Sequence, residues 1–308
     1  MNSLLATLGG KLTERWLNLL VLPGALFLAA AAAGATLGHR HWHDAGRLRD
    51  RLDELASRPA LDHPGTAALL VAFVLLAATA ASLAAQFLGG AIERWWLRPG
   101  RDALSRGLAA RRARRWRERD ARLDDTLGRA HAAAAGPSGP VTVPGDLPAR
   151  IQALTEARDR VAPREPVRPT WYGDRMQAAA DRVEAAYGVD LAALWPRLWL
   201  VLPETGVRQI QWAHDSFGAA ARLAAWAVGY ALLACWWWPA APAALGCAAV
   251  ARSRARASLD ALAGLVEAAV DVHGRELATR IGLLPPETPG RLTPDTGDGM
   301  SELFRKAE

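Results

Sequence analysis

The chain has 308 residues, of which 51% are apolar and 22% charged, and its formal net charge is +6. The apolar residues are concentrated in three blocks and the charges lie between them, which excludes the two soluble domains that this length would allow. Lys11 and Lys306 are the two lysines of the sequence. We attribute the high content of alanine and arginine to a GC-rich genome and not to function.

The three blocks are Trp16 to Leu37, Gly65 to Ile92 and Leu223 to Ala251, with 22, 28 and 29 residues and no charged side chain. About 20 apolar residues of helix cross a bilayer, so each block is long enough to span it. Lys11 and Arg15 precede the first block as they would in a signal peptide, but its length favours an uncleaved helix.

The first span is predicted at 16–37, with Pro23 and Gly24 at a kink or near its start. An outward loop follows at 38–64. His39, His41, His43 and Asp44 could offer metal ligands there, although a polar collar at the end of the span is the favoured interpretation.

The second span is predicted at 65–92. Thr79, Ser82 and Gln86 share one face with Gly89 and Gly90, a pattern that favours helix packing over conduction. No span has a charged residue in its middle, which argues against an ion or proton pathway.

The last block contains its own turn. Trp236, Trp237 and Trp238 precede Pro239 and Pro242, and tryptophan favours the headgroup level while proline ends helices. We expect helices at about 217–238 and 243–262, and one long tilted span is the alternative. Cys235 and Cys247 flank this turn, as inert thiols or as a disulfide.

Arginine placement predicts the orientation. Eleven arginines lie between Arg94 and Arg122, so the 93–216 segment is expected in the cytoplasm. A four-span count then places both termini on the same side. The predicted fold class is all-α, with four transmembrane helices in two pairs, in the inner (plasma) membrane of a bacterium.

The 93–216 segment begins with a predicted amphipathic helix from about 99 to 135, whose apolar stripe includes Leu104, Trp116 and Leu123. A glycine- and proline-rich linker at 136–148 and a short helix at 149–161 follow. The basic face of the long helix is predicted to contact anionic lipid, and a nucleic-acid interface is disfavoured because no recognition motif accompanies it. The predicted lipid contacts are Arg111, Arg112, Arg114, Arg115, Arg117 and Arg119.

The most distinctive passage runs from Pro169-Thr170 and Gly173 through Tyr187-Gly188-Val189-Asp190 to Trp195-Pro196-Arg197-Leu198. Thr170 and Asp190 are predicted N-caps, and Gly188 a left-handed C-cap. With Asp271, His273, Arg275 and Leu277 in the tail, this passage resembles a group of uncharacterised integral membrane proteins of actinobacteria and other bacteria. The resemblance implies a membrane architecture and no activity.

A cytoplasmic amphipathic helix is expected to about residue 282, followed by a flexible tail. His273 shares a face with Leu259, Val266 and Leu277, which favours a packed core histidine over a ligand. Asp271 and Arg275 are predicted to form an exposed i, i+4 pair. His214 and Asp215 could handle protons beside the membrane, but a solvated turn is favoured.

We expect a membrane-anchored scaffold or interaction module that is not an enzyme, with no catalytic, cofactor or metal residues. Its expected partners are the bilayer and either another protein or a second copy of itself. The first alternative is an oligomeric channel or transporter. The second is a lipid-acting enzyme using Asp174, Arg197, His214 and Asp215.

Overall fold

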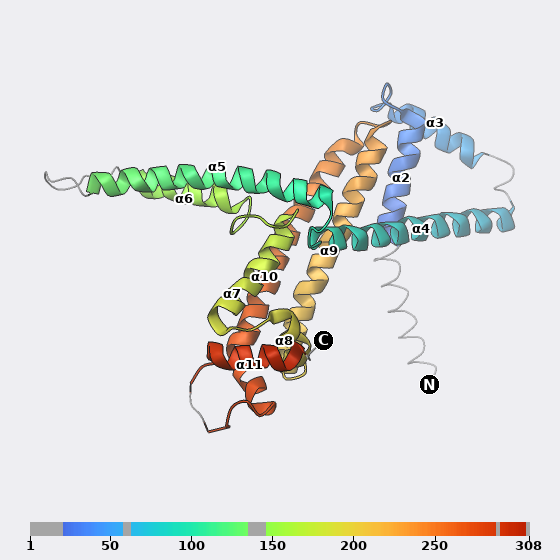
Figure 1. The fold of residues 1–308 in the computed structure, drawn as a ribbon. Coiled ribbons are helices and arrows are strands. Elements are labelled where there is room, and N and C mark those ends of the chain that lie inside the picture. Colours follow the sequence, from blue (N-terminus) through green and yellow to red (C-terminus); the bar gives the residue numbers. More distant parts are fainter. Residues whose placement is uncertain (1–20, 58–62, 135–145, 288–289, 306–308) are drawn as a thin grey trace, which may run out of the picture. The chain divides into compact units, whose positions relative to one another are not determined.

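The computed structural model describes residues 21–57, 63–134, 146–287 and 290–305, and every regular element in these ranges is an α-helix (Figure 1). The chain divides into two compact units. We call residues 1–93 and 217–255 the apolar unit, and residues 94–216 and 256–308 the polar unit. Two long helices, α9 (Glu204–Ala234) and α10 (Ala240–Arg280), contribute to both units.

The apolar unit contains α2 (Leu22–Leu37), α3 (Ala45–Ala56) and most of α4 (Pro64–Trp96). Pro23 lies in the first turn of α2, where its missing N–H has no intrahelical partner to lose. Gly24 allows α2 to cross α4 closely, because an added Cβ would lie 1.9 Å from the carbonyl oxygen of Ala78. Further along α4, Gly89 packs against Arg222 of α9 while Gly90 faces open space, so one of the two glycines has the predicted packing role.

The predicted break between the third and fourth helices is present, because α9 ends at Ala234 and α10 begins at Ala240. His39, just beyond α2, binds the turn between them. Its Nδ1 accepts a hydrogen bond from the Trp238 N–H at 3.3 Å, so its Nε2 carries the proton and donates to the Cys235 carbonyl at 3.0 Å. Both cysteines are free thiols.

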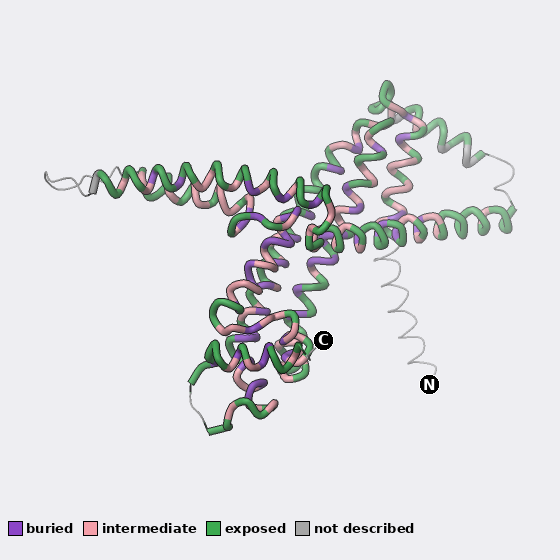
Figure 2. The backbone as a smooth tube through the Cα atoms, in the orientation of Figure 1, coloured by how far each residue is buried: buried purple, intermediate pink, exposed green. Residues whose placement is uncertain are grey.

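Two helices in the described ranges are long and apolar enough to cross a membrane, namely α4 and α9. Only 11% of the most apolar window of α4 is buried, unlike the core helix of a soluble protein, and Figure 2 shows α4 exposed over most of its length. Large apolar side chains such as Leu69, Phe73 and Phe87 are among those exposed. A bilayer would cover such a surface, which gives weak support to a membrane location.

The boundaries of the remaining predicted spans differ from the structure. The described part of the first apolar helix has 16 residues, and residues 16–20 lie outside the described ranges. The third helix starts at Glu204 instead of 217, and the fourth continues without a break for 41 residues to Arg280. The uncharged part of α10 covers about three turns, so four spans stay a prediction.

The polar unit is built from α5 (Ala103–Ala134), α6 (Leu147–Asp159), α7 (Trp171–Tyr187), α8 (Leu191–Trp199) and α11 (Pro294–Arg305), with parts of α9 and α10. Helices α5 and α6 lie side by side (Figure 1). The main core joins α7, α8, α10 and α11. Its fully buried members are Val183, Val189, Leu194, Leu198, Val270, Leu277, Ala278 and Met300.

The predicted caps in the distinctive passage are confirmed. The Thr170 Oγ1 accepts a hydrogen bond from the Gly173 N–H, and the Asp190 carboxylate accepts one from the Ala192 N–H. Gly188 ends α7 with φ +66°, a conformation that glycine adopts without steric cost. Local side-chain chemistry thus fixes the ends of α7 and the start of α8.

Two predicted irregular segments contain helices. The outward loop at 38–64 includes α3, whose first turn is capped by a hydrogen bond from the Arg47 N–H to the Asp44 carboxylate. The supposedly flexible tail includes α11, in which Gly297, Met300 and Ser301 are buried. Packing against α7 and α8 therefore organises a segment whose glycines disfavour a helix.

Two predictions about side chains are wrong. Asp271 and Arg275 each take another partner: the Tyr187 hydroxyl donates to Asp271 at 2.8 Å, and Arg275 donates to the Gly290 carbonyl at 2.8 Å. Leu104, assigned to the apolar stripe of α5, is 70% exposed, while Ala109 and Ala113 are buried in its place.

Candidate ligand-binding cavity

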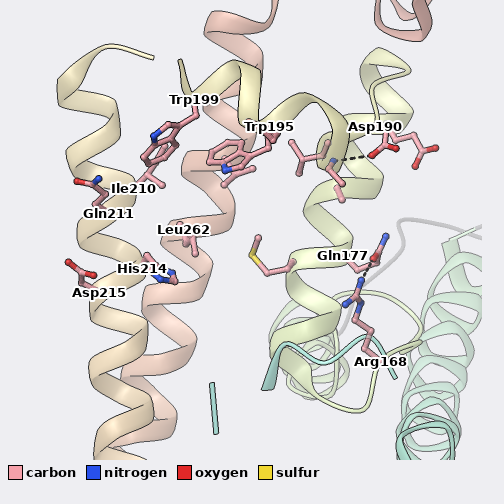
Figure 3. A pocket seen from close by; sticks show the side chains of 17 residues that line it. Arg168, Gln177, Asp190, Trp195, Trp199, Ile210, Gln211, His214, Asp215 and Leu262 are labelled. Atoms are coloured by element: carbon pink, nitrogen blue, oxygen red, sulfur yellow. Dashed lines mark hydrogen bonds between the residues drawn. The ribbon is translucent and has the colours of Figure 1, made fainter. Parts of the chain in front are cut away.

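A cavity of about 1000 Å³ lies within the polar unit (Figure 3). Four helices contribute to its walls, and its apolar lining comes from Met176 and Ala180 of α7, Trp195 and Trp199 of α8, Ile210 of α9, and Leu262 and Val266 of α10. Small-molecule sites usually measure about 300 to 1,000 Å³ and are mostly apolar with a few polar groups. The cavity fits this description at its upper size limit.

The spacing of these side chains follows from helix geometry. Met176, Ala180 and Glu184 recur every four residues along α7, and Trp195 and Trp199 do the same on α8, so each set lines one face of its helix. The cap at Asp190 sets the start of α8 immediately after α7. The two tryptophan rings lie 5.8 Å apart with an interplanar angle of 53°.

Polar groups lie at two sides of the cavity. Arg168 and Gln177 face each other on one side, where the guanidinium donates to the Gln177 side-chain oxygen (Figure 3). Gln211, His214 and Asp215 of α9 lie on the other side, where His214 points toward α7 while Gln211 and Asp215 point away from it (Figure 3). Asp215 also lines a shallower hollow of about 550 Å³ with Arg208 and Trp212, so it lies at the rim.

The residues suggested for catalysis are only partly brought together. His214 and Asp215 line the cavity, in agreement with their sequence position just before the apolar part of α9. Arg197 instead donates to the Ala193 carbonyl at 2.7 Å and its guanidinium lies over the Phe304 ring at 4.6 Å. Asp174 is buried in a separate network.

That network holds the start of α7. The Asp174 carboxylate accepts hydrogen bonds from the Arg112 guanidinium and from the backbone N–H groups of Val167 and Arg168. Burial raises the pKa of the Asp174 carboxyl above its usual value, against the lowering effect of the Arg168 amide and of Arg112. Arg112 also donates to the Val161 and Arg168 carbonyls, so it connects α5 to the segment before α7.

The six arginines predicted to contact lipid therefore differ in their surroundings. Arg112 and Arg119 point into the polar unit. Arg112 donates to the Arg168 carbonyl and Arg119 donates to the Ala157 carbonyl. Arg114 pairs with Glu118 at 3.3 Å and Arg117 with Glu165 at 3.1 Å, both at the surface. Arg111 and Arg115 are exposed, and no ion pair to either is found in the described part of the chain.

Two further histidines have side-chain partners. His41 shares a hydrogen bond of 2.8 Å with Arg47, and His273 is half-buried at 3.2 Å from the Glu276 carboxylate. Among the residues that the structure describes, no group of three or more His, Cys, Asp or Glu side chains is arranged to hold a metal ion.

Sequence reasoning did not find the cavity. The sequence patterns that could have predicted it are the spacing of Met176, Ala180 and Glu184 and that of Trp195 and Trp199. Each pattern is also compatible with a helix face packed in an ordinary core. Comparison with family models, with curated proteins and with solved structures found no match. The geometry of the cavity is therefore the main guide to function.

Proposed function

We propose that this protein is a membrane-anchored binding module that holds a small amphipathic molecule in the cavity of its polar unit. The observation that carries the proposal is the large cavity walled by Met176, Trp195, Trp199 and Leu262, in a chain that also has two helices suited to a bilayer. An apolar cavity with polar groups at two sides suits a ligand that has both an apolar and a polar part.

Residues in and next to the cavity lining favour a ligand that enters from the membrane surface. His214 and Asp215 directly precede the apolar half of α9, and Trp195, Trp199 and Trp212 are the amphipathic residues that favour a bilayer interface. The proposal includes a bacterial inner membrane, four spans and a cytoplasmic polar unit, on the arginine argument given above. A partner protein could then respond to ligand occupancy.

A binding role is favoured over a lipid-acting enzyme because Asp174 and Arg197 are engaged away from the cavity. An oligomeric channel is less favoured, since two polar side chains of α4 are engaged within the chain: Ser82 is buried near Gly24, and the Thr79 hydroxyl donates to the Leu75 carbonyl.

The test is photolabelling of the full chain in lipid nanodiscs with a neutral diazirine-bearing decanol, followed by peptide mapping. Ala180→Phe places a ring in the cavity, whereas Ala185→Phe adds the same ring at an exposed position of α7 that does not line it. We expect labelling of residues 191–199 in the unsubstituted chain and in A185F, and its loss in A180F. Equal labelling in all three chains would contradict the proposal.

A further inference from the structure

We infer that the cavity selects an amphipathic cation: a positively charged nitrogen head with a hydrocarbon tail. This inference rests on the proposed binding function and names the class of its ligand. It depends on three observations, which are the ionisable groups left without partners, the tryptophan pair and the apolar lining.

The charged groups of the lining are unequally engaged. Arg168 donates to Gln177 and, at 3.5 Å, to the Leu97 carbonyl, so two of its five N–H donors are used, both by uncharged groups. Asp190 caps α8 and lies 3.4 Å from an Arg305 nitrogen.

Glu184 and Asp215 are different. Both carboxylates are exposed, and in the described ranges no ion pair or hydrogen bond to either is found. These two carboxylates, from α7 and α9, outnumber the Arg168 guanidinium, so the balance of charge that remains available to a ligand is negative. A cationic head complements it.

The tryptophan pair adds a second attraction for a cation. The faces of aromatic rings carry negative electrostatic potential, and tryptophan binds cations best. With rings 5.8 Å apart and inclined at 53°, Trp195 and Trp199 present two such faces on one wall. This attraction corresponds to about twofold to thirtyfold in affinity.

The apolar part of the cavity lining would accommodate the hydrocarbon tail. Met176, Leu262 and Val266 line the cavity with side chains that carry no charge, and methionine adapts to irregular apolar shapes. A cavity of about 1000 Å³ has room for a medium-length alkyl chain together with the head.

The experiment measures binding of four decyl amphiphiles by calorimetry, below their micelle concentrations, with empty discs subtracted. The full chain is placed in nanodiscs of uncharged digalactosyl lipid, so that the lipid supplies no competing ammonium group. The probes are decyltrimethylammonium, decylphosphocholine, decyl sulfate and decyl maltoside. We expect decyltrimethylammonium to bind at least about tenfold tighter than decyl maltoside, with decyl sulfate weakest.

Two double variants separate the local charge from the overall charge. Glu184→Gln with Asp215→Asn should weaken decyltrimethylammonium binding about tenfold and leave decyl maltoside unchanged. Asp124→Asn with Glu302→Gln removes two exposed carboxylates that do not line the cavity, and it should bind like the unsubstituted chain.

Each outcome has a distinct meaning. Equal binding of cation and maltoside, both lost in A180F, overturns the cation inference and leaves the binding function standing. Absence of binding by all four probes overturns both. Tight binding of decylphosphocholine along with the cation assigns the head to a lipid, whereas its weak binding assigns a free cation.

Discussion

Arg112 joins three segments of the chain through one guanidinium group. It contacts Asp174 and the carbonyls of Val161 and Arg168, and the side chain of Asp174 is only 5% exposed. Such a pair is costly to break, because removing one partner leaves a buried charge without compensation. Arg112 was predicted to contact lipid because it belongs to a basic helix that directly follows a predicted span, and its actual partner lies 62 residues away in sequence.

Replacing Arg112 by alanine should destabilise the polar unit by about 3 to 5 kcal/mol, since Asp174 would keep its burial and lose its counter-charge. The neighbouring substitution Arg111→Ala removes an exposed arginine and should change stability by less than about 0.5 kcal/mol. Thermal unfolding of both variants in the same detergent measures the difference. Similar stability of the two variants would show that the buried pair is unimportant.

Glu267 of α10 gives stability that depends on pH. Partial burial raises the pKa of its carboxyl, but hydrogen bonds and charge from Arg182 and Arg175 outweigh this, and the pKa lies below its usual value. A lowered folded pKa stabilises the protein above the unfolded value of about 4.3. This stabilisation is lost as the pH falls through the lowered folded pKa.

The thermal midpoint of the unsubstituted chain should therefore exceed that of Glu267→Gln at pH 7, and the gap should narrow as the pH falls from about 5 to 3. Glu302→Gln serves as control, because Glu302 is exposed and does not contact these arginines. A gap for Glu267→Gln that stays constant over this range would rule out the ionic contribution.

At the scale of elements, helix α11 depends on one close approach. An added Cβ at Gly297 would lie 1.7 Å from the Tyr187 carbonyl oxygen and 2.7 Å from a Val189 methyl carbon. The helix therefore docks on the end of α7 only because position 297 has no side chain. The sequence around it contains two glycines and a proline, so local propensity predicted a flexible tail where tertiary contact forms a helix.

Gly297→Ala should destabilise the polar unit by about 1 to 3 kcal/mol, because either α11 or α7 must move. Gly299→Ala lies two residues along the same helix, where a Cβ meets nothing within 4 Å, and it should be neutral or stabilising by up to about 1 kcal/mol. Hydrogen exchange of residues 294–305 reports the docking directly. Faster exchange in both variants, or in neither, would be inconsistent with this contact.

Elements defined by local signals were predicted well. Proline and tryptophan marked the turn after α9, and Thr170, Gly188 and Asp190 marked the ends of α7 and α8, because these effects act over a few residues. The start of α9 was placed late because its polar first half lacks the apolar pattern used to detect it. The cavity combines side chains from four helices, and no local pattern specifies how such faces converge.

At the scale of the whole molecule, the strongest sequence signal is the separation of apolar blocks from charged segments, and the structure retains it as two units. One further surface belongs to this scale. Arg111, Arg115 and Arg122 recur at positions close to one line along the outside of α5, and all three are exposed without an ion pair in the described ranges. We propose that this line contacts anionic headgroups, each arginine adding about 1 kcal/mol.

Chemical footprinting with phenylglyoxal should show the contact residue by residue. In nanodiscs containing anionic lipid, modification of Arg111, Arg115 and Arg122 should be slower than in discs of neutral lipid. Arg114 pairs with Glu118 of α5 and Arg117 with Glu165, and both arginines serve as internal controls whose rates should not change. Equal slowing of both sets would point to a general electrostatic effect instead of a defined contact.

The free thiols near the turn between α9 and α10 allow the membrane topology of the natural chain to be measured by thiol labelling. Cys235 and Cys247 are the two cysteines in 308 residues, and Cys235 is exposed at the turn held by His39. Cys247→Ser leaves a single reactive group there without any engineered label. In intact cells, reaction of Cys235 with a membrane-impermeant maleimide would place the turn outside, and reaction only after lysis would reverse the orientation predicted from the arginines.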